Sequence, residues 1–201
     1  MRRLALSLVL LVGVAGCASD VGVAAQVGDK TIKISEVQAS VNSVIALRNK
    51  LKSAADPNIS DLSRSQLRFH MLSALIDNVA AQLKIVATPA EVDARRKAIR
   101  DQLGGQEAVD KAMSDAGIAA EDFSRYLTDV IIEDKVGALL AANAPAGTEG
   151  DAARGAAIQN AIRTVAKRLT VKVNPRYGTW DAQKVDVVQL DTTGGSVSPL
   201  D

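Results

Sequence analysis

The segment VKVNPRYGTWD, residues 171–181, decides how we expect the chain to close on itself. Its first residues alternate valine with lysine, which is the pattern of a half-buried strand. Pro175 has no backbone N–H to donate, so strand pairing should end there. Tyr177 and Trp180 are two of the five aromatic residues in the chain (one Trp, two Tyr, two Phe). A solvated tail would not concentrate such scarce side chains, so we predict a closing strand.

A second strand segment stands at the other end of the predicted domain. Residues 24–34, AAQVGDKTIKI, alternate apolar and polar side chains on both sides of Gly28-Asp29. Such a pattern around a glycine-containing dipeptide predicts a β-hairpin. We expect residues 171–174 to pair with this hairpin, and Tyr177 and Trp180 to pack on apolar helices as a clasp.

Helical patterns fill the chain between the two strand segments. Apolar residues recur there at the spacing of one helix face. Start signals are Ser35 with Gln38, Ser63 with Gln66, and Thr88-Pro89 with Glu91. The predicted helices cover residues 36–52, 63–83, 89–103, 106–116, 120–143 and 151–168. The predicted fold class is mainly α: about six helices and a small β-hairpin, joined by a returning C-terminal strand.

The first seventeen residues, MRRLALSLVLLVGVAGC, have the pattern of an export signal. Two arginines precede an apolar run that is too short to span a bilayer comfortably. Small residues then precede Cys17, and this arrangement resembles the bacterial lipobox. The lipobox implies a signal peptide over residues 1–16, palmitate or a similar acyl chain on Cys17, and a tether over residues 17–23. The alternative is an ordinary secretory leader with a chance cysteine.

These assignments predict the organisation and the location of the protein. Residues 24–181 form one helical domain, and residues 182–201, which include Gly-Gly, Ser and Pro, form a flexible tail. The domain is expected at the extracytoplasmic face of a bacterial cell membrane, anchored through lipid on Cys17.

The charge balance argues against whole classes of partner. The net charge is +1, and removing the two leader arginines leaves 22 basic and 23 acidic residues, or −1. Binding to nucleic acid needs a basic footprint, and electrostatic docking on anionic lipid needs a polybasic cluster. We therefore expect neither nucleic acid nor an anionic lipid surface as an electrostatic partner.

Few residues are available for catalysis. His70 is the only histidine, and Cys17 is the only cysteine. Ser73 and Asp77 lie near His70 in sequence, but on a helix His70 and Asp77 are about two turns apart and cannot form a relay. A metal site needs more ligands than one histidine provides. We predict no enzyme, no catalytic residue, no metal, no cofactor and no small-molecule substrate, with His70 solvated.

A dense run of charges occupies residues 91–100. Its spacing suggests the solvated face of a helix with pairs four residues apart, Glu91 with Arg95 and Asp93 with Lys97. A partner-binding surface is the alternative interpretation.

Four short motifs, in order, resemble the N-terminal domain of SurA-like and PrsA-like foldases. They are VGDKTI (27–32) with SEV (35–37), LIDN (75–78) with ATPAEV (87–92), GI (117–118) with EDF (121–123), and VNPRYGTW (173–180). The resemblance covers roughly residues 24–181. It implies an extracytoplasmic chaperone for secreted or outer-envelope polypeptides.

Many members of that family carry a parvulin prolyl isomerase domain before the returning C-terminal helix. Here that place holds only residues 144–150, APAGTEG, whereas a parvulin needs on the order of a hundred residues. The family's isomerase site uses paired histidines and a Cys or Asp, and this chain has one histidine. The resemblance therefore implies a family member without prolyl isomerase activity.

The expected function is that of a membrane-tethered, ATP-independent chaperone or holdase for unfolded or nascent exported proteins. Its client-binding surface is expected on the wide apolar stripe of the first helix, at Val41, Val44 and Ile45, with Tyr177 and Trp180 beside it. The alternative for the stripe is ordinary core. The alternative function is a structural or accessory lipoprotein that docks one dedicated envelope partner.

Overall fold

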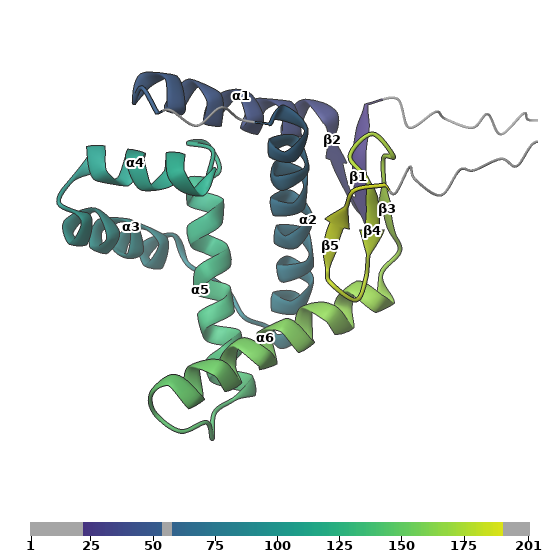
Figure 1. The fold of residues 1–201 in the computed structure, drawn as a ribbon. Coiled ribbons are helices and arrows are strands. Elements are labelled where there is room, and N and C mark those ends of the chain that lie inside the picture. Colours follow the sequence, from purple (N-terminus) through teal and green to yellow (C-terminus); the bar gives the residue numbers. More distant parts are fainter. Residues whose placement is uncertain (1–21, 54–57, 191–201) are drawn as a thin grey trace, which may run out of the picture.

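The computed structural model describes residues 22–53 and 58–190, which form a mainly helical fold with small antiparallel sheets (Figure 1). The helices are α1 (Ile34–Lys50), α2 (Ile59–Leu83), α3 (Pro89–Leu103), α4 (Gln106–Ala116), α5 (Phe123–Leu140) and α6 (Thr148–Arg168). The strands are β1 (Val23–Val27), β2 (Lys30–Lys33), β3 (Val171–Val173), β4 (Thr179–Asp181) and β5 (Asp186–Val188). The predicted fold class is confirmed.

The closing strand pairs where the sequence predicts. One sheet has the order β2-β1-β3, and both pairings are antiparallel. In the β1–β3 pairing Ala25 lies opposite Val173. The Asn174 backbone N–H donates to Ala24 O at 2.8 Å, and its side-chain amide donates to Val23 O at 3.0 Å. Pairing stops at Pro175, as expected for a residue without an N–H. The two ends of the domain are thus joined through one strand.

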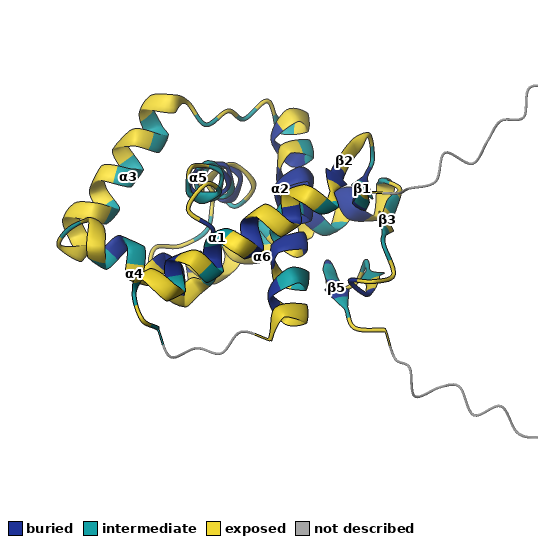
Figure 2. Ribbon diagram, turned by 90° about the horizontal axis from the view of Figure 1, so that it is seen from above, coloured by how far each residue is buried: buried dark blue, intermediate teal, exposed yellow. Residues whose placement is uncertain are grey.

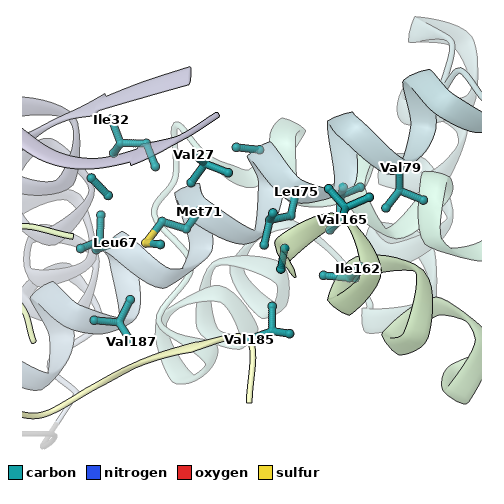
Figure 3. Close-up of a cluster of buried hydrophobic side chains, with 14 of the residues drawn as sticks. Val27, Ile32, Leu67, Met71, Leu75, Val79, Ile162, Val165, Val185 and Val187 are labelled. Atoms are coloured by element: carbon teal, nitrogen blue, oxygen red, sulfur yellow. The ribbon is translucent and has the colours of Figure 1, made fainter. Parts of the chain in front are cut away.

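Helix α2 carries the main core (Figure 3). Leu67, Met71, Leu75 and Val79 follow one another at four-residue intervals and are at most 4% exposed. Helical geometry therefore places them on one face. The face contacts residues from the three-stranded sheet, α6 and the C-terminal hairpin: Val27, Ile32, Ile162, Val165, Val185 and Val187. One long helix is thereby packed against three separate parts of the chain.

Helix α1 begins earlier than predicted. Its first residue is Ile34, and Lys33 stands at the N-cap position. The Lys33 N–H donates to Glu36 Oε2 at 2.8 Å, which satisfies one of the free donors at the helix start. The predicted Ser35 cap is wrong because Ser35 already lies inside the first turn.

Helix α2 also begins before its predicted start. The Asn58 side chain accepts from the N–H groups of Ser60 and Asp61, so Asn58 is the N-cap. The predicted capping pair, Ser63 with Gln66, is wrong for a tertiary reason. Gln66 is buried and donates to Gly117 O at 2.8 Å instead of capping its own helix.

Helices α3 and α4 form an arm beside α5, with few apolar contacts. The Thr88 cap and its reciprocal bond with Glu91 are confirmed, and α3 ends at Gly104 in the left-handed conformation (φ +87°). Helix α3 has no buried residue, and Figure 2 shows it mostly exposed. Charged side chains of α3 form ion pairs with α5. Glu91 Oε1 lies 2.6 Å from Lys135 Nζ, and Arg95 pairs with Asp134. The predicted Glu91–Arg95 pair is replaced by these contacts between helices.

The C-terminal segment is ordered for longer than predicted. Strands β4 and β5 pair as an antiparallel hairpin, and Val185 and Val187 are buried in the main core. The flexible tail predicted from residue 182 is therefore wrong up to residue 188, whereas residues 191–201 lie outside the described part. Tyr177 is only 7% exposed, and Trp180 packs partly buried against the same core. These two aromatics form the predicted clasp.

Candidate functional site

Two hollows lie beside α2, on the side that faces α1, α4 and α5. We call the first the apolar groove; it has a volume of about 330 Å³. Helix α2 contributes Phe69 and Leu72, and α5 contributes Tyr126. The α4–α5 connection contributes Ile118 and Ala119. The remaining lining residues are Ser65, Gln66, Arg68, Ala116, Gly117 and Asp122. Aromatic and aliphatic side chains on three elements thus converge on one opening.

Local sequence signals position the walls of the apolar groove. Phe69 and Leu72 are three residues apart, so they lie on one side of α2, and both are half-buried. Helix α4 ends at Gly117 with φ +67°, a left-handed conformation that suits glycine. The turn brings Ile118 toward α2, where Gln66 bonds to the Gly117 carbonyl at 2.8 Å. One buried glutamine thereby ties the two walls together.

The second hollow, which we call the acidic cavity, has a volume of about 360 Å³. Its charged lining comprises four carboxylates against one lysine, one arginine and His70. These are Glu36, Asp77, Glu121 and Asp122 with Lys30, Arg125 and His70; Ile32, Ala39, Ser40, Ser73 and Ala74 complete the wall. Asp122 is the residue that the linings of both hollows share, so the acidic cavity and the apolar groove adjoin at Asp122.

His70 has partners that the sequence did not predict. Its Nε2 lies 3.0 Å from Ser40 Oγ, and Ser40 Oγ donates to Asp122 Oδ2 at 2.6 Å. Burial lowers the pKa of His70, although the nearby Asp122 opposes the shift. His70 is therefore not the solvated side chain that was predicted.

The Ser40–His70–Asp122 contact does not have the geometry of a catalytic triad. In a triad the histidine stands between the other two groups and bonds each through a different ring nitrogen. Here both His70 and Asp122 contact the serine hydroxyl itself. Ser40 is also only 2% exposed, so a substrate cannot reach its oxygen in this structure. The contact joins α1, α2 and the start of α5.

A second polar network joins α2 to α5 further along. Arg125 Nη2 donates to Asp77 Oδ1 at 2.8 Å and to Asp129 Oδ1 at 2.6 Å. Ser73 Oγ donates to the other oxygen of Asp129, which is buried. Burial raises the pKa of Asp129, while Ser73 and Arg125 oppose the shift. Ser73 and Asp77, which the sequence places near His70, thus serve this network.

The predicted client-binding residues lie mostly in the interior. Val41 and Val44 are 0% exposed and pack in a small core of their own, with Ile45 partly buried against it. Tyr177 and Trp180 belong to the main core. Neither valine is available to a ligand at the surface of this structure, so for these two residues the alternative interpretation, ordinary core, is correct. Cys17 lies outside the described residues.

The residues that line the apolar groove were missed for an identifiable reason. Phe69 and Tyr126 are two of the chain's five aromatics, so their scarcity was a signal. Their convergence depends on how α2 and α5 pack, which the sequence pattern does not fix.

Within residues 22–53 and 58–190, no group of three or more His, Cys, Asp or Glu side chains is arranged to hold a metal ion. None of the described helices combines the length and apolar character needed to cross a bilayer.

Comparisons with known proteins leave the family open. No protein-family model matches the chain, and no curated protein and no solved structure matches it either. The resemblance to SurA-like foldases therefore stays a hypothesis that rests on the four sequence motifs.

Proposed function

We propose that this protein is an ATP-independent chaperone that holds unfolded segments of exported proteins near a membrane, without prolyl isomerase activity. The observation that carries the proposal is the apolar groove. Phe69, Leu72, Ile118 and Tyr126 present apolar and aromatic surface at an opening. Apolar surface that accepts many sequences is what a holdase needs, and exposed apolar hollows mark interaction sites.

The size of the apolar groove fits weak and reversible binding. A hollow of about 330 Å³ admits one or two side chains and not a folded partner. Burying one aromatic side chain removes roughly 150–250 Å² from water, which stabilises a complex by about 4–6 kcal/mol before ordering costs. Such a complex has a Kd of roughly tens of micromolar to a millimolar or weaker, and it dissociates on its own. Release then requires no nucleotide.

The N-terminal sequence supports the proposed location. A lipid on Cys17 would leave six residues, Cys17 itself and residues 18–22, before β1 begins at Val23. A fully extended chain of that length spans at most about 22 Å. The domain would therefore act close to the outer face of the membrane, where exported chains emerge.

A second candidate function is that of an accessory lipoprotein with one dedicated partner. Its support is a separate apolar feature at the end of α5, where Leu139 and Leu140 are 54% and 46% exposed. A fixed partner would cover such a patch permanently, whereas a holdase would use the apolar groove.

Suppression of aggregation tests the proposal and separates the two candidates. The chain from residue 17 onward, with Cys17→Ser to keep it soluble, is mixed with a chemically denatured client, and light scattering is followed. We expect suppression that Phe69→Ser abolishes and the matched Leu139→Ser leaves intact. Absence of suppression at several-fold molar excess would reject the chaperone. Crosslinking in membranes that yields one stoichiometric partner, lost with Leu139→Ser, would favour the accessory lipoprotein.

A further inference from the structure

Asp122, which lines both the apolar groove and the acidic cavity, is a carboxylate that has no lysine or arginine partner among the described residues. Its side chain is 16% exposed. Its Oδ2 accepts from Ser40 at 2.6 Å, and the nearest basic group is His70 Nε2 at 3.9 Å. Within the described residues, no lysine or arginine lies at ion-pair distance from Asp122. A largely buried carboxylate is costly unless a positive charge offsets it.

The rest of the acidic cavity does not supply that charge. Arg125 is already shared between Asp77 and Asp129. Glu36 and Glu121 also line the cavity, and among the residues with described positions neither forms an ion pair. Lys30 is the remaining cation of the lining. Three carboxylates therefore face one lysine, and the cavity is complementary to an incoming positive charge.

The rim of the apolar groove differs from the cavity in this respect. Its cation, Arg68, pairs with Asp186 at 3.1 Å. The charge of Arg68 is thereby offset within the protein, whereas no lysine or arginine of the described ranges offsets the charge of Asp122. A bound segment would meet apolar surface and one negative group.

We propose that the site selects polypeptide segments in which an apolar side chain stands beside a lysine or arginine. The apolar side chain enters the groove between Phe69 and Tyr126, and the cationic group enters the acidic cavity and pairs with Asp122. This inference rests on the proposed chaperone function and names the class of segment that it holds. A charge-assisted hydrogen bond raises affinity by roughly tenfold or more.

Peptide binding tests the inference. Fluorescently labelled peptides of equal length alternate Leu-Lys, Leu-Gln, Leu-Glu or Ser-Lys, and anisotropy reports their binding to the soluble Cys17→Ser chain. We expect the Leu-Lys peptide to bind about tenfold more tightly than Leu-Gln at low salt. Leu-Glu should bind more weakly still, and Ser-Lys should bind poorly because the apolar groove stays empty.

Matched variants assign the preference to one carboxylate. Asp122→Asn should lower Leu-Lys affinity to the Leu-Gln level and leave Leu-Gln unchanged. Asp93→Asn removes the same charge from an exposed site on α3 and should have no effect. If thermal unfolding shows that Asp122→Asn does not fold, Glu121→Gln at the exposed edge of the cavity replaces it, with a smaller expected loss.

The outcomes separate this inference from the proposed function. Equal binding of Leu-Lys and Leu-Gln, or equal losses in Asp122→Asn and Asp93→Asn, would overturn the charge selection and leave the chaperone standing. Equal binding of Ser-Lys and Leu-Lys would overturn the link between cavity and groove. Failure of every peptide to bind would overturn both proposals.

Discussion

Two regions of the molecule, the core around α2 and the α3–α4 arm, are stabilised in different ways. The side of α2 that faces β1, β2, β3 and α6 is a continuous apolar core built around residues with almost no exposure. The arm formed by α3 and α4 has only a small cluster, Leu47 with Val109 and Met113, and α3 buries no residue. Caps and exposed ion pairs add to this small cluster, and such pairs contribute about 0–1 kcal/mol each. The apolar groove lies at the boundary between these two regions.

This contrast predicts where the molecule can change shape. Regions with few buried apolar contacts open locally at a lower free energy than the global unfolding free energy. One wall of the apolar groove is the α4–α5 connection, and the other is α2. The α2 wall is rigid, whereas the α4–α5 connection is attached to a weakly held arm. Movement of that connection would let the apolar groove accept side chains of different size.

Leucine truncations should show the largest difference between the two regions. Leu75 is 0% exposed in the core, and Leu103 is 43% exposed at the end of α3. Leu75→Ala should lower the free energy of unfolding by about 2–5 kcal/mol because it leaves a cavity. Leu103→Ala should change it by less than about 0.5 kcal/mol. Urea unfolding of both variants measures the difference, and equal losses would show that the arm is as tightly packed as the core.

Glycine substitutions test whether the C-terminal hairpin belongs to the core region. Gly178 has φ +132°, and a Cβ there would lie 2.2 Å from Val188 O. Gly178→Ala should therefore cost about 1–3 kcal/mol or more, through strain and displacement of β5. Gly155 lies within α6, and a Cβ added there would meet no neighbouring group within 4 Å, so Gly155→Ala should stabilise by about 0.5–1 kcal/mol. If thermal unfolding shows Gly178→Ala to be as stable as the wild type or more stable, that result would contradict this structure of the hairpin.

Removing the α3 cap should act on the arm alone. Thr88 Oγ1 accepts from the Glu91 N–H, and Glu91 Oε2 accepts from the Thr88 N–H at 2.8 Å. Thr88→Ala should cost about 1 kcal/mol. Hydrogen exchange should quicken at α3 amides by about fivefold and leave the centre of α2 unchanged, since 1.4 kcal/mol corresponds to a factor of ten. Faster exchange throughout α2 would mean that the arm and the core unfold together.

The same contrast explains what could be predicted from the sequence. The hairpin, the closing strand and the start of α3 were predicted because their signals are local: a turn dipeptide, strand alternation, and Thr88-Pro89 with Glu91. The start of α2 was missed because Gln66, three residues after a serine, serves a contact with Gly117. Local patterns cannot distinguish a cap from a side chain that reaches another helix.

The candidate site was harder to predict because it is made entirely by packing. The apolar stripe on α1 gave the right helix face, yet Val41 and Val44 are enclosed by Leu62 and Ala119 from elsewhere in the chain. His70 contacts Ser40, which lies thirty residues earlier in the chain, and it lies close to Asp122, which comes later in the chain. No spacing rule connects positions that only the tertiary fold brings together.

The smallest expected effect concerns His70, where α1, α2 and α5 meet between the two regions. The groups that face it are Ser40, Asp122, Glu36, Lys30 and Arg125. Burial lowers its pKa below the ordinary value of 6.5 in the folded state, so below that pH the unfolded chain binds more protons than the folded chain. Stability is therefore full above pH 6.5 and declines as the pH falls through 6.5 toward the lowered folded-state pKa.

His70→Gln isolates this contribution, because glutamine keeps a hydrogen-bonding group near Ser40 but does not titrate. Melting temperatures of both proteins are measured by circular dichroism between pH 7.5 and 5.5. The wild type should lose more than the variant over that range, by less than the loss caused by Leu75→Ala. The raised pKa of Asp129 acts with the opposite sign, but both proteins contain Asp129, so its contribution cancels in the comparison. Parallel curves would show that His70 does not couple the junction to pH, and a steeper decline in the variant would mean that Asp122 outweighs burial.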